Sequence, residues 1–547
     1  MKAALAGNVL VAVLLGVFLA SAAPRLKSEG RDIGSLMLGT PDEFEIAKGL
    51  YGMFVDRTLD YKVPAYPGAY PMLSYLVAKP ILKLVGFGER NLILLLRWLS
   101  AIFGAATLLL LYVATRAVGG SPWAGLLAAG FLASSPEYLF WSVRIHPDTM
   151  VLFELVFAQL ALALAVHRRS QRWLTVALVM MALGAMTKIV GIFLLPWVVL
   201  AQAYLDFSED SPTRVRLRSF VLHVFWGGLI FLVIAYVTTP MLLVDSRAFL
   251  ASMKTTSTLT STGWQRFAAI GWLEVFWGDK LAGAVGTVLF GLWAVSFVPA
   301  LVRILRAPRD RLKDFGAAAL RPLPFLFFAA GFIGYLIVFS KNFQVRYAMP
   351  ALPSAAVGIG LMAAGAFPHL ERLSSWIASK PGWTRVVATA LAIGLFIPEL
   401  KSRKWHLDGD LESLSARGQD PRLAVGEWLA ENAPANARVI FDYHVYVPIK
   451  FEKAFVTWGL LESQVTNIDP HFVLIQDDRR ALFSKEEDAE GDEEARWYHK
   501  NRVQTLRRLE QGELPGLRLA KRFDAAKITV YSSSTALSCS GVCSLKP

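Results

Sequence analysis

Long apolar runs recur along the first 400 residues of the chain and then stop. About eleven of them are long enough to cross the roughly 30 Å hydrocarbon core of a bilayer as helices. The first covers residues 1–23, and the others cover approximately residues 92–115, 122–139, 148–166, 173–187, 189–205, 220–243, 281–302, 322–339, 350–367 and 384–399. Strands of a membrane barrel would show weaker, alternating segments. The pattern therefore predicts an all-α polytopic membrane protein for residues 1–400.

The first run has two interpretations. Its single Lys2, its short apolar core and the small residues 20–23 fit a cleaved signal peptide. The core is also near spanning length and many further spans follow it, which favours a retained helix.

The loop of residues 24–91 is unusually long for a connection between spans and has structure of its own. Apolar positions recur at helical spacing between residues 44 and 55, which predicts a helix lying in the plane of the membrane interface. Tyr66 and Tyr70 belong to a turn rich in proline and tyrosine, and a second short apolar helix follows at residues 72–84.

From about residue 401 the chain becomes charged and mixed, which predicts a second domain over residues 401–547. Residues 439–441, 472–475 and 528–531 are candidate strands, and residues 423–433 and 496–509 are candidate helices. This pattern is typical of a compact α/β domain outside the membrane. The only two cysteines, Cys539 and Cys543, could form a small disulfide loop or remain free thiols, and they are too few for a metal site.

Composition agrees with a membrane protein, because 54% of the residues are hydrophobic and only 18% are charged. A net charge of +13 could suit a nucleic-acid partner, but the basic residues lie in alternate short loops, at residues 167–172, 214–218 and 303–313. The positive-inside rule makes these loops cytoplasmic and places the loop of residues 24–91 outside. The charge pattern therefore predicts no nucleic-acid binding.

Pro41-Asp42-Glu43 opens the predicted interfacial helix on the outer side. With Thr40 at the N-cap, Glu43 at the third helical position fits a capping box, in which its carboxylate reaches back to the Thr40 amide. Asp42 is then left near the membrane surface, where partial desolvation would raise its pKa and make it a general base. Simple complementarity with the helix dipole is the alternative.

Other charged residues gather in outer turns. Arg144, His146 and Asp148 lie between two spans, where Asp148 could face the same cavity as Asp42 or merely cap a helix. Lys188 lies at the apex of an apolar hairpin and Arg346 precedes Tyr347, so both cations oppose the positive-inside bias. Binding of a lipid-linked phosphate would explain the two cations, and snorkelling in an interfacial belt is the alternative.

The order of these motifs resembles the GT-C membrane glycosyltransferases. The resemblance is greatest to the superfamily of protein mannosyltransferases, aminoarabinose transferases and rhizobial galacturonosyltransferase-like proteins, and it spans about residues 1–400. It is carried by Pro41-Asp42-Glu43, Tyr66 to Tyr75, Arg97-Trp98-Leu99-Ser100, Gly184 to Lys188 and Arg346 to Pro350. The chain has Gly68-Ala69-Tyr70-Pro71 where some members have Lys-Pro-Pro-Leu, so no phosphate-binding lysine is implied there.

The resemblance implies transfer of a sugar from a polyprenyl-phosphate donor to a lipid, glycan or protein acceptor at the periplasmic face of the inner membrane. Asp42 matches the catalytic aspartate of the first loop, and a base there would give single displacement with inversion. The remaining candidates fall into three groups: Asp148 and Glu43 as second carboxylate or acceptor contact, Arg346, Lys188 and Arg144 on the donor phosphate, and Tyr347, Tyr66, Tyr70 and His146 as substrate or lipid contacts.

No cofactor and no metal site are predicted, although a divalent cation could assist the departing phosphate. A transporter or lipid-linked-sugar flippase is the alternative function. It is disfavoured because the ionisable residues gather at the outer ends of the spans and no two halves of the chain match in hydropathy.

Overall fold

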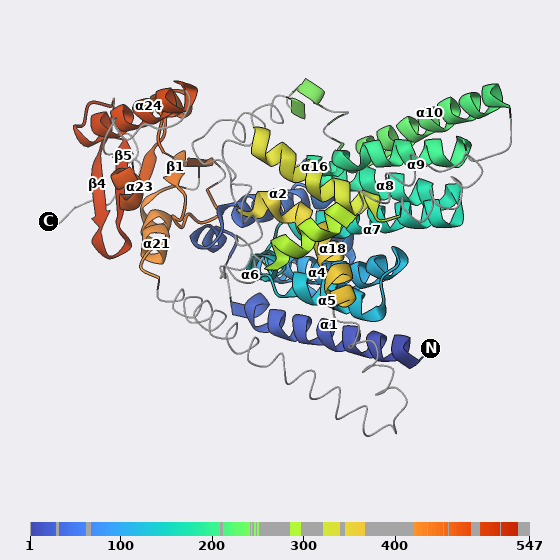
Figure 1. The fold of residues 1–547 in the computed structure, drawn as a ribbon. Helices are drawn as coiled ribbons and strands as arrows, with labels where there is room; N and C mark the ends of the chain where they lie inside the picture. The colour runs from blue at the N-terminus through green and yellow to red at the C-terminus, as the bar shows by residue number, and fades with distance from the viewer. Residues whose placement is uncertain are drawn as a thin grey trace, which may run out of the picture.

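The computed structural model describes residues 2–28, 32–61, 67–207, 212–240, 285–296, 321–339 and 345–366, a few positions from 242 to 250 and, with short gaps, residues 420–533. The predicted span at 384–399, the two cysteines and the boundary predicted near residue 400 lie outside these residues. Helices form one part of the molecule, and a small sheet with its own helices lies at the opposite end (Figure 1).

The helical part contains these elements in chain order: α1 (Lys2–Ser28), η1 (Gly34–Leu38), α2 (Pro41–Val55), α3 (Ala69–Val85), α4 (Glu89–Ala117), α5 (Pro122–Ala133), α6 (Pro136–Trp141), α7 (Asp148–Arg168), α8 (Gln171–Thr187), η2 (Ile189–Leu194), α9 (Leu195–Phe207), α10 (Thr213–Thr238), α16 (Leu323–Phe339), α17 (Val345–Ala348), η3 (Met349–Ala351) and α18 (Leu352–Ala366). A further apolar helix covers Val285–Ser296.

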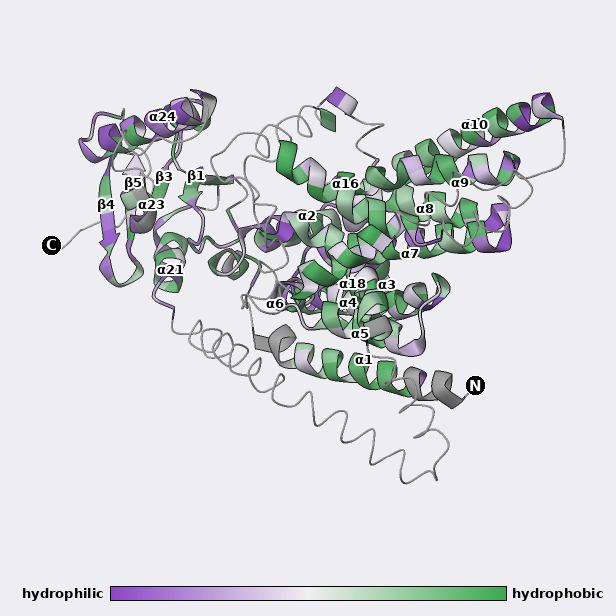
Figure 2. Ribbon diagram, in the orientation of Figure 1, coloured by the Kyte–Doolittle hydropathy of each residue, from purple (hydrophilic) through white to green (hydrophobic). Residues whose placement is uncertain are grey.

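Five helical segments in the described part of the chain are long and apolar enough to cross a membrane: Glu89–Ala117, Asp148–Arg168, Ile189–Phe207, Thr213–Thr238 and Val345–Ala364. Shorter apolar helices accompany them, among them Asn8–Ala23 and Leu323–Phe339. Figure 2 shows how hydrophobic positions dominate these helices, whereas hydrophilic ones dominate the outer parts of the sheet domain. The chain is a multi-pass membrane protein.

Most predicted spans agree with helices to within a few residues, but two differ in kind. The span predicted at 122–139 breaks after Ala133, because Ser135 caps a new helix at Pro136 by accepting a hydrogen bond from the Tyr138 amide at 3.3 Å. The span predicted at 189–205 begins as a 3₁₀ helix, η2, before it continues as α9. Both irregularities lie next to the polar residues described below.

Helix α7 is the centre of the helical part. It packs against α4 and α8, and nearly all its apolar side chains are buried. Helix α18 packs against α5 with Gly360 at the contact, where an added Cβ would lie 2.4 Å from the Ala124 carbonyl oxygen. The two backbones can approach this closely only because Gly360 has no side chain.

The sheet has five strands: β1 (Val439–Asp442), β2 (Ala454–Thr457), β3 (Phe472–Gln476), β4 (Leu517–Phe523) and β5 (Ile528–Ser533). Their order is β2-β1-β3-β5-β4, with β2, β1 and β3 parallel and β5 and β4 antiparallel to their neighbours. The sequence correctly predicted β1, β3 and β5. It missed β2 and β4, which lie at the edges and carry charged or exposed side chains.

Both faces of the sheet are covered, as the alternation of side chains along a strand requires. Ile440, Val473 and Tyr531 face α22 (Glu462–Ile468) and α24 (Glu493–Glu510). Phe441, Phe472 and Val530 face α21 (Leu423–Asn432) and, beyond it, the segment η1–α2 of the first loop.

Helix α2 therefore shares one hydrophobic core with the sheet. Phe44 of α2 meets Phe441 of β1 edge to face, with ring centroids 6.1 Å apart. Tyr446 donates a hydrogen bond to Asp32 at 2.7 Å, and Lys48 donates one to the Ala454 carbonyl at 3.3 Å. The amphipathic helix exists as predicted, but protein covers its apolar face: η1, α3, α4 and the sheet domain.

The close contact between α18 and α5 gives a first prediction. Gly360→Ala would force the two backbones apart, and we expect it to destabilise the detergent-solubilised protein by about 1–3 kcal/mol. Gly334→Ala on α16 is the matched control, because nothing lies within 4 Å of the added Cβ. Thermal unfolding should show a lower midpoint for the first variant only, and equal midpoints would contradict the packing described.

Candidate active site

Glu43 lies at the centre of a buried polar group between α2, α4 and the loop before α7. Its carboxylate accepts hydrogen bonds from Arg97 Nε at 2.7 Å and Arg97 Nη2 at 3.0 Å. The Ile145 amide donates a third at 2.9 Å, and Arg144 Nη1 lies 3.4 Å away. The Glu43 and Arg97 side chains are each 1% exposed, so this is a buried, bidentate ion pair.

These contacts correct the predicted capping box. Thr40 is the N-cap of α2 and Pro41 is the first helical residue, as predicted, but no side chain caps this end of the helix. Burial raises the pKa of Glu43, whereas the charges and hydrogen bonds of Arg97 and Arg144 lower it, and the net direction is downward. Glu43 is therefore an ionised structural anchor, and its role as an acceptor contact stays a prediction.

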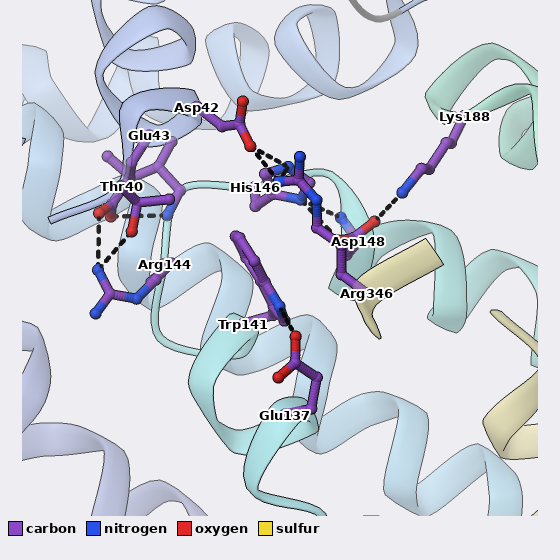
Figure 3. A network of polar contacts seen from close by, with 11 residues as sticks. Thr40, Asp42, Glu43, Glu137, Trp141, Arg144, His146, Asp148, Lys188 and Arg346 are labelled. Carbon is purple, nitrogen blue, oxygen red and sulfur yellow. Dashed lines mark hydrogen bonds and ion pairs between the residues drawn. The ribbon is translucent and has the colours of Figure 1, made fainter. Parts of the chain in front are cut away.

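Arg144 belongs to the same buried group. Its Nη1 donates to Thr40 Oγ1 at 3.0 Å, and its guanidinium lies 4.1 Å from the Phe140 ring centroid. Figure 3 shows Arg144 beside Glu43 and Thr40, whereas Arg346 lies with Asp42 and His146. The structure thus separates Arg144 from Arg346 and Lys188, the other two predicted phosphate-binding cations, because the Arg144 guanidinium pairs with Glu43.

Asp42, the neighbour of Glu43, points into a second group of polar side chains. Its Oδ2 accepts a hydrogen bond from Arg346 Nη1 in an ion pair, and His146 Nε2 lies 3.9 Å from the same oxygen. The Asp42 side chain is 34% exposed, whereas that of Arg346 is 13% and that of His146 is 1% exposed. Asp42 is therefore the carboxylate of this group that opens towards solvent.

The prediction of a raised pKa for Asp42 is wrong for this state of the protein. Burial raises the pKa, but the positive charge of Arg346, with contributions from His146, outweighs it, so that the pKa lies below its ordinary value. The sequence showed the desolvation but could not show that a residue 304 positions away supplies the opposing charge.

Asp148 and Lys188 complete the second group. Asp148 begins α7 and is buried, and its Oδ1 accepts a hydrogen bond from Lys188 Nζ at 2.6 Å. Its Oδ2 lies 3.0 Å from His146 Nδ1, so the two nitrogens of His146 face Asp148 and Asp42 respectively. Three turns predicted separately thus meet at one place, and His146 is at its centre.

The predicted aromatic contacts have different surroundings. The Tyr347 ring lies 5.9 Å from Lys188 Nζ and 5.6 Å from the Arg346 guanidinium, at the second group. Tyr70 is 1% exposed within the core of α2, α3 and α4, and its role as a substrate contact stays a prediction. Tyr66 lies outside the described residues.

Three further residues of the site were not assigned from sequence. Arg97 is an isolated cation inside the apolar helix α4, which is a signal of a paired or functional group. Trp141 and Glu137 of α6 lie beneath His146 and Arg346, and no periodicity or motif identified them (Figure 3). Within the described part of the chain, no three His, Cys, Asp or Glu side chains converge as a metal ion requires.

The middle of the helical part matches a known protein family. A family model described as dolichyl-phosphate-mannose-protein mannosyltransferase matches residues 67–240, which include Arg97, His146, Asp148 and Lys188 but neither Asp42 nor Arg346. No curated protein matches the chain in sequence.

Solved structures match the chain over most of its length. ArnT from Cupriavidus metallidurans in the apo state has a TM-score of 0.52 at 15% identity, covering 98% of this chain and 99% of that one. The same protein bound to undecaprenyl phosphate has a TM-score of 0.52 at 14% identity, with 97% and 98% covered. The oligosaccharyltransferase AglB from Archaeoglobus fulgidus, in complex with an inhibitory peptide and a dolichol-phosphate, has a TM-score of 0.53 at 14% identity, with 88% and 71% covered.

These likenesses show the fold. The chain has the GT-C fold that these structures share, with the α/β domain following the helical part. This confirms the fold predicted from the order of the sequence motifs.

The buried ion pair gives a second prediction. Glu43→Gln leaves the Arg97 charge buried without its counter-ion, and we expect a loss of about 3–5 kcal/mol of stability. Glu462→Gln breaks an ion pair with Arg508 at the surface, where the Glu462 side chain is 51% exposed and that of Arg508 is 39% exposed. This change should cost at most about 1 kcal/mol. Denaturant unfolding in detergent measures both, and equal stability of the two variants would contradict an anchoring role for Glu43.

Proposed function

We propose that this protein is an integral membrane glycosyltransferase that moves a sugar from a polyprenyl-phosphate-linked donor to an acceptor hydroxyl. The GT-C fold supports the reaction class. The contact between Asp42 and Arg346 is the observation that carries the proposal, because it joins a partly exposed carboxylate to a cation suited to phosphate.

Asp42 is the general base in this proposal. The acceptor oxygen attacks the anomeric carbon of the sugar while the bond from that carbon to the donor phosphate oxygen breaks. The hydroxyl proton passes to Asp42, and the polyprenyl phosphate leaves with the bonding electron pair. A single displacement of this kind inverts the anomeric configuration.

Arg346 and Lys188 stabilise the leaving group. A sugar phosphodiester carries one negative charge and the departing phosphate develops a second, so nearby cations lower the barrier in a site shielded from water. In the structure each cation has a carboxylate partner, Asp42 for Arg346 and Asp148 for Lys188. We infer that the donor phosphate takes the place of these carboxylates and thereby releases Asp42 from Arg346.

The positive-inside pattern supports an active site and an α/β domain at the periplasmic face of the inner membrane. The acceptor is then a lipid, glycan or protein of the cell envelope. Asp148 is the second carboxylate of the site, and Tyr347 is placed to contact the lipid or the sugar.

The proposal is tested by incubating the purified protein with a panel of polyprenyl-phosphate sugars and candidate acceptors. Release of polyprenyl phosphate with sugar transfer supports it. If no donor is consumed while lipid-linked sugar crosses the bilayer of proteoliposomes that contain the protein, the protein is a flippase.

Removing the base gives a third prediction. Asp42→Asn should lower the transfer rate about 10²- to 10⁴-fold, because the amide cannot accept the proton. Donor binding should be retained or become tighter, because the amide no longer competes with the phosphate for Arg346. Asp56→Asn is the matched control: it makes the same change at the exposed C-cap of α2. Transfer by a folded Asp42→Asn variant at the wild-type rate would exclude Asp42 as the base.

The ion pair with Arg346 gives a fourth prediction, on pH dependence. In the free protein Arg346 and His146 hold the pKa of Asp42 below its ordinary value. The acid limb of kcat/KM, the pH range in which this rate constant falls because Asp42 becomes protonated, should therefore lie below about pH 4. Once phosphate binds Arg346, Asp42 loses this support while it remains partly buried, and its pKa rises. The acid limb of kcat should therefore lie at higher pH than that of kcat/KM.

Rate profiles at several donor concentrations measure both limbs. In an Arg346→Gln variant the two limbs should coincide, because Arg346 is then absent with and without donor. Coincident limbs in the wild type would show that the donor does not displace Asp42 from Arg346.

A further inference from the structure

Trp141 lies directly beneath the two residues that surround Asp42. Its ring centroid is 4.6 Å from that of His146, with an angle of 51° between the planes. The Arg346 guanidinium carbon lies 5.2 Å from the same ring centroid. Trp141 is only 7% exposed, so its ring supports these two side chains without itself opening to solvent.

The orientation of the indole is fixed by a hydrogen bond. Trp141 Nε1 donates to Glu137 Oε1 at 2.7 Å, one turn earlier in α6. Figure 3 shows Glu137 on the far side of the indole from Asp42. Glu137 thus holds the indole in one rotamer, in which the face of the Trp141 ring contacts the Arg346 guanidinium.

The short helix α6 is itself anchored. The Tyr138 hydroxyl donates to the Gly104 carbonyl of α4 at 2.6 Å, and Tyr138 is completely buried. Ser135 caps the first turn. The position of Trp141 is therefore set by α4, which also carries Arg97, the partner of Glu43.

Arg346 needs such support because its own element is short. Helix α17 has four residues, from Val345 to Ala348. Once a phosphate replaces Asp42, the aromatic rings of Trp141 and Tyr347 still contact its guanidinium, as does His146, whose Nε2 lies 3.4 Å from Arg346 Nη1. A cation over an aromatic face is held by the quadrupole of the ring, and shielding from water strengthens this contact.

We propose that Trp141, oriented by Glu137, is a positioning residue that keeps Arg346 in place to receive the phosphate of the donor. This inference builds on the proposed function. It concerns residues that act through Arg346 and do not themselves touch the reacting atoms.

Steady-state kinetics with a polyprenyl-phosphate sugar test the inference. Trp141→Leu removes the aromatic face and should lower kcat/KM roughly 2- to 30-fold, the range of a cation–π contact. Trp141→Phe keeps a ring but loses the N–H group, and should lose less. Glu137→Gln retains an acceptor for the indole and should lose less than Glu137→Ala, which leaves the N–H without its partner.

A double-mutant cycle separates positioning from general damage to the fold. If Trp141 acts through Arg346, Trp141→Leu should cause less than about a 2-fold further loss in an Arg346→Ala background. An equal loss in both backgrounds, or full activity of Trp141→Leu, would overturn the inference. Trp173→Leu is the matched control, because Trp173 makes its cation–π contact with Arg168 at the end of α8 remote from Lys188.

Binding of undecaprenyl phosphate to the same variants distinguishes this inference from the proposed function. If the wild type binds the lipid phosphate but transfers no sugar, the proposed function fails. Weaker binding by Trp141→Leu than by Trp173→Leu then still supports positioning, and equal binding overturns it. If the wild type neither binds nor transfers, both proposals fail.

Discussion

Glu43 and Arg97 form an ion pair with almost no exposure to water, and two charges are stable there only when good geometry and further hydrogen bonds compensate their desolvation. The pair meets this condition through the Ile145 amide and Arg144. It ties α2 to α4 and to the loop before α7, and this loop carries His146 and leads into Asp148. The relative position of Asp42 and His146 depends on this anchor.

The adjacent residues Asp42 and Glu43 have different surroundings because successive side chains on a helix point about 100° apart. Glu43 points into the protein and holds α2, whereas Asp42 points to Arg346 and is partly exposed. On its other side α2 packs against the sheet domain through Phe44 and Phe441. The α/β domain is thus structurally continuous with the helix that carries the proposed base.

The second group of charges is balanced in the structure: Asp42 faces Arg346 and Asp148 faces Lys188, with His146 between the two carboxylates. Such pairing gives each of these charges a counter-ion before any ligand binds. In the proposed reaction it also links binding to catalysis, because a phosphate that takes Arg346 frees Asp42 to accept a proton. The same cation that holds the base inactive would then stabilise the leaving group.

The sequence alone determined which segments are apolar enough to span a membrane, three strands of the sheet, and Asp42, Asp148, Lys188 and Arg346 as unusual charges. These features are local, since they depend on composition and spacing within one segment. Only the tertiary structure decided how the charges pair, because Asp42 and Arg346 are 304 positions apart and Glu43 meets Arg97 across two helices. The capping box failed for this reason: a buried arginine offers a carboxylate a stronger partner than a backbone amide does.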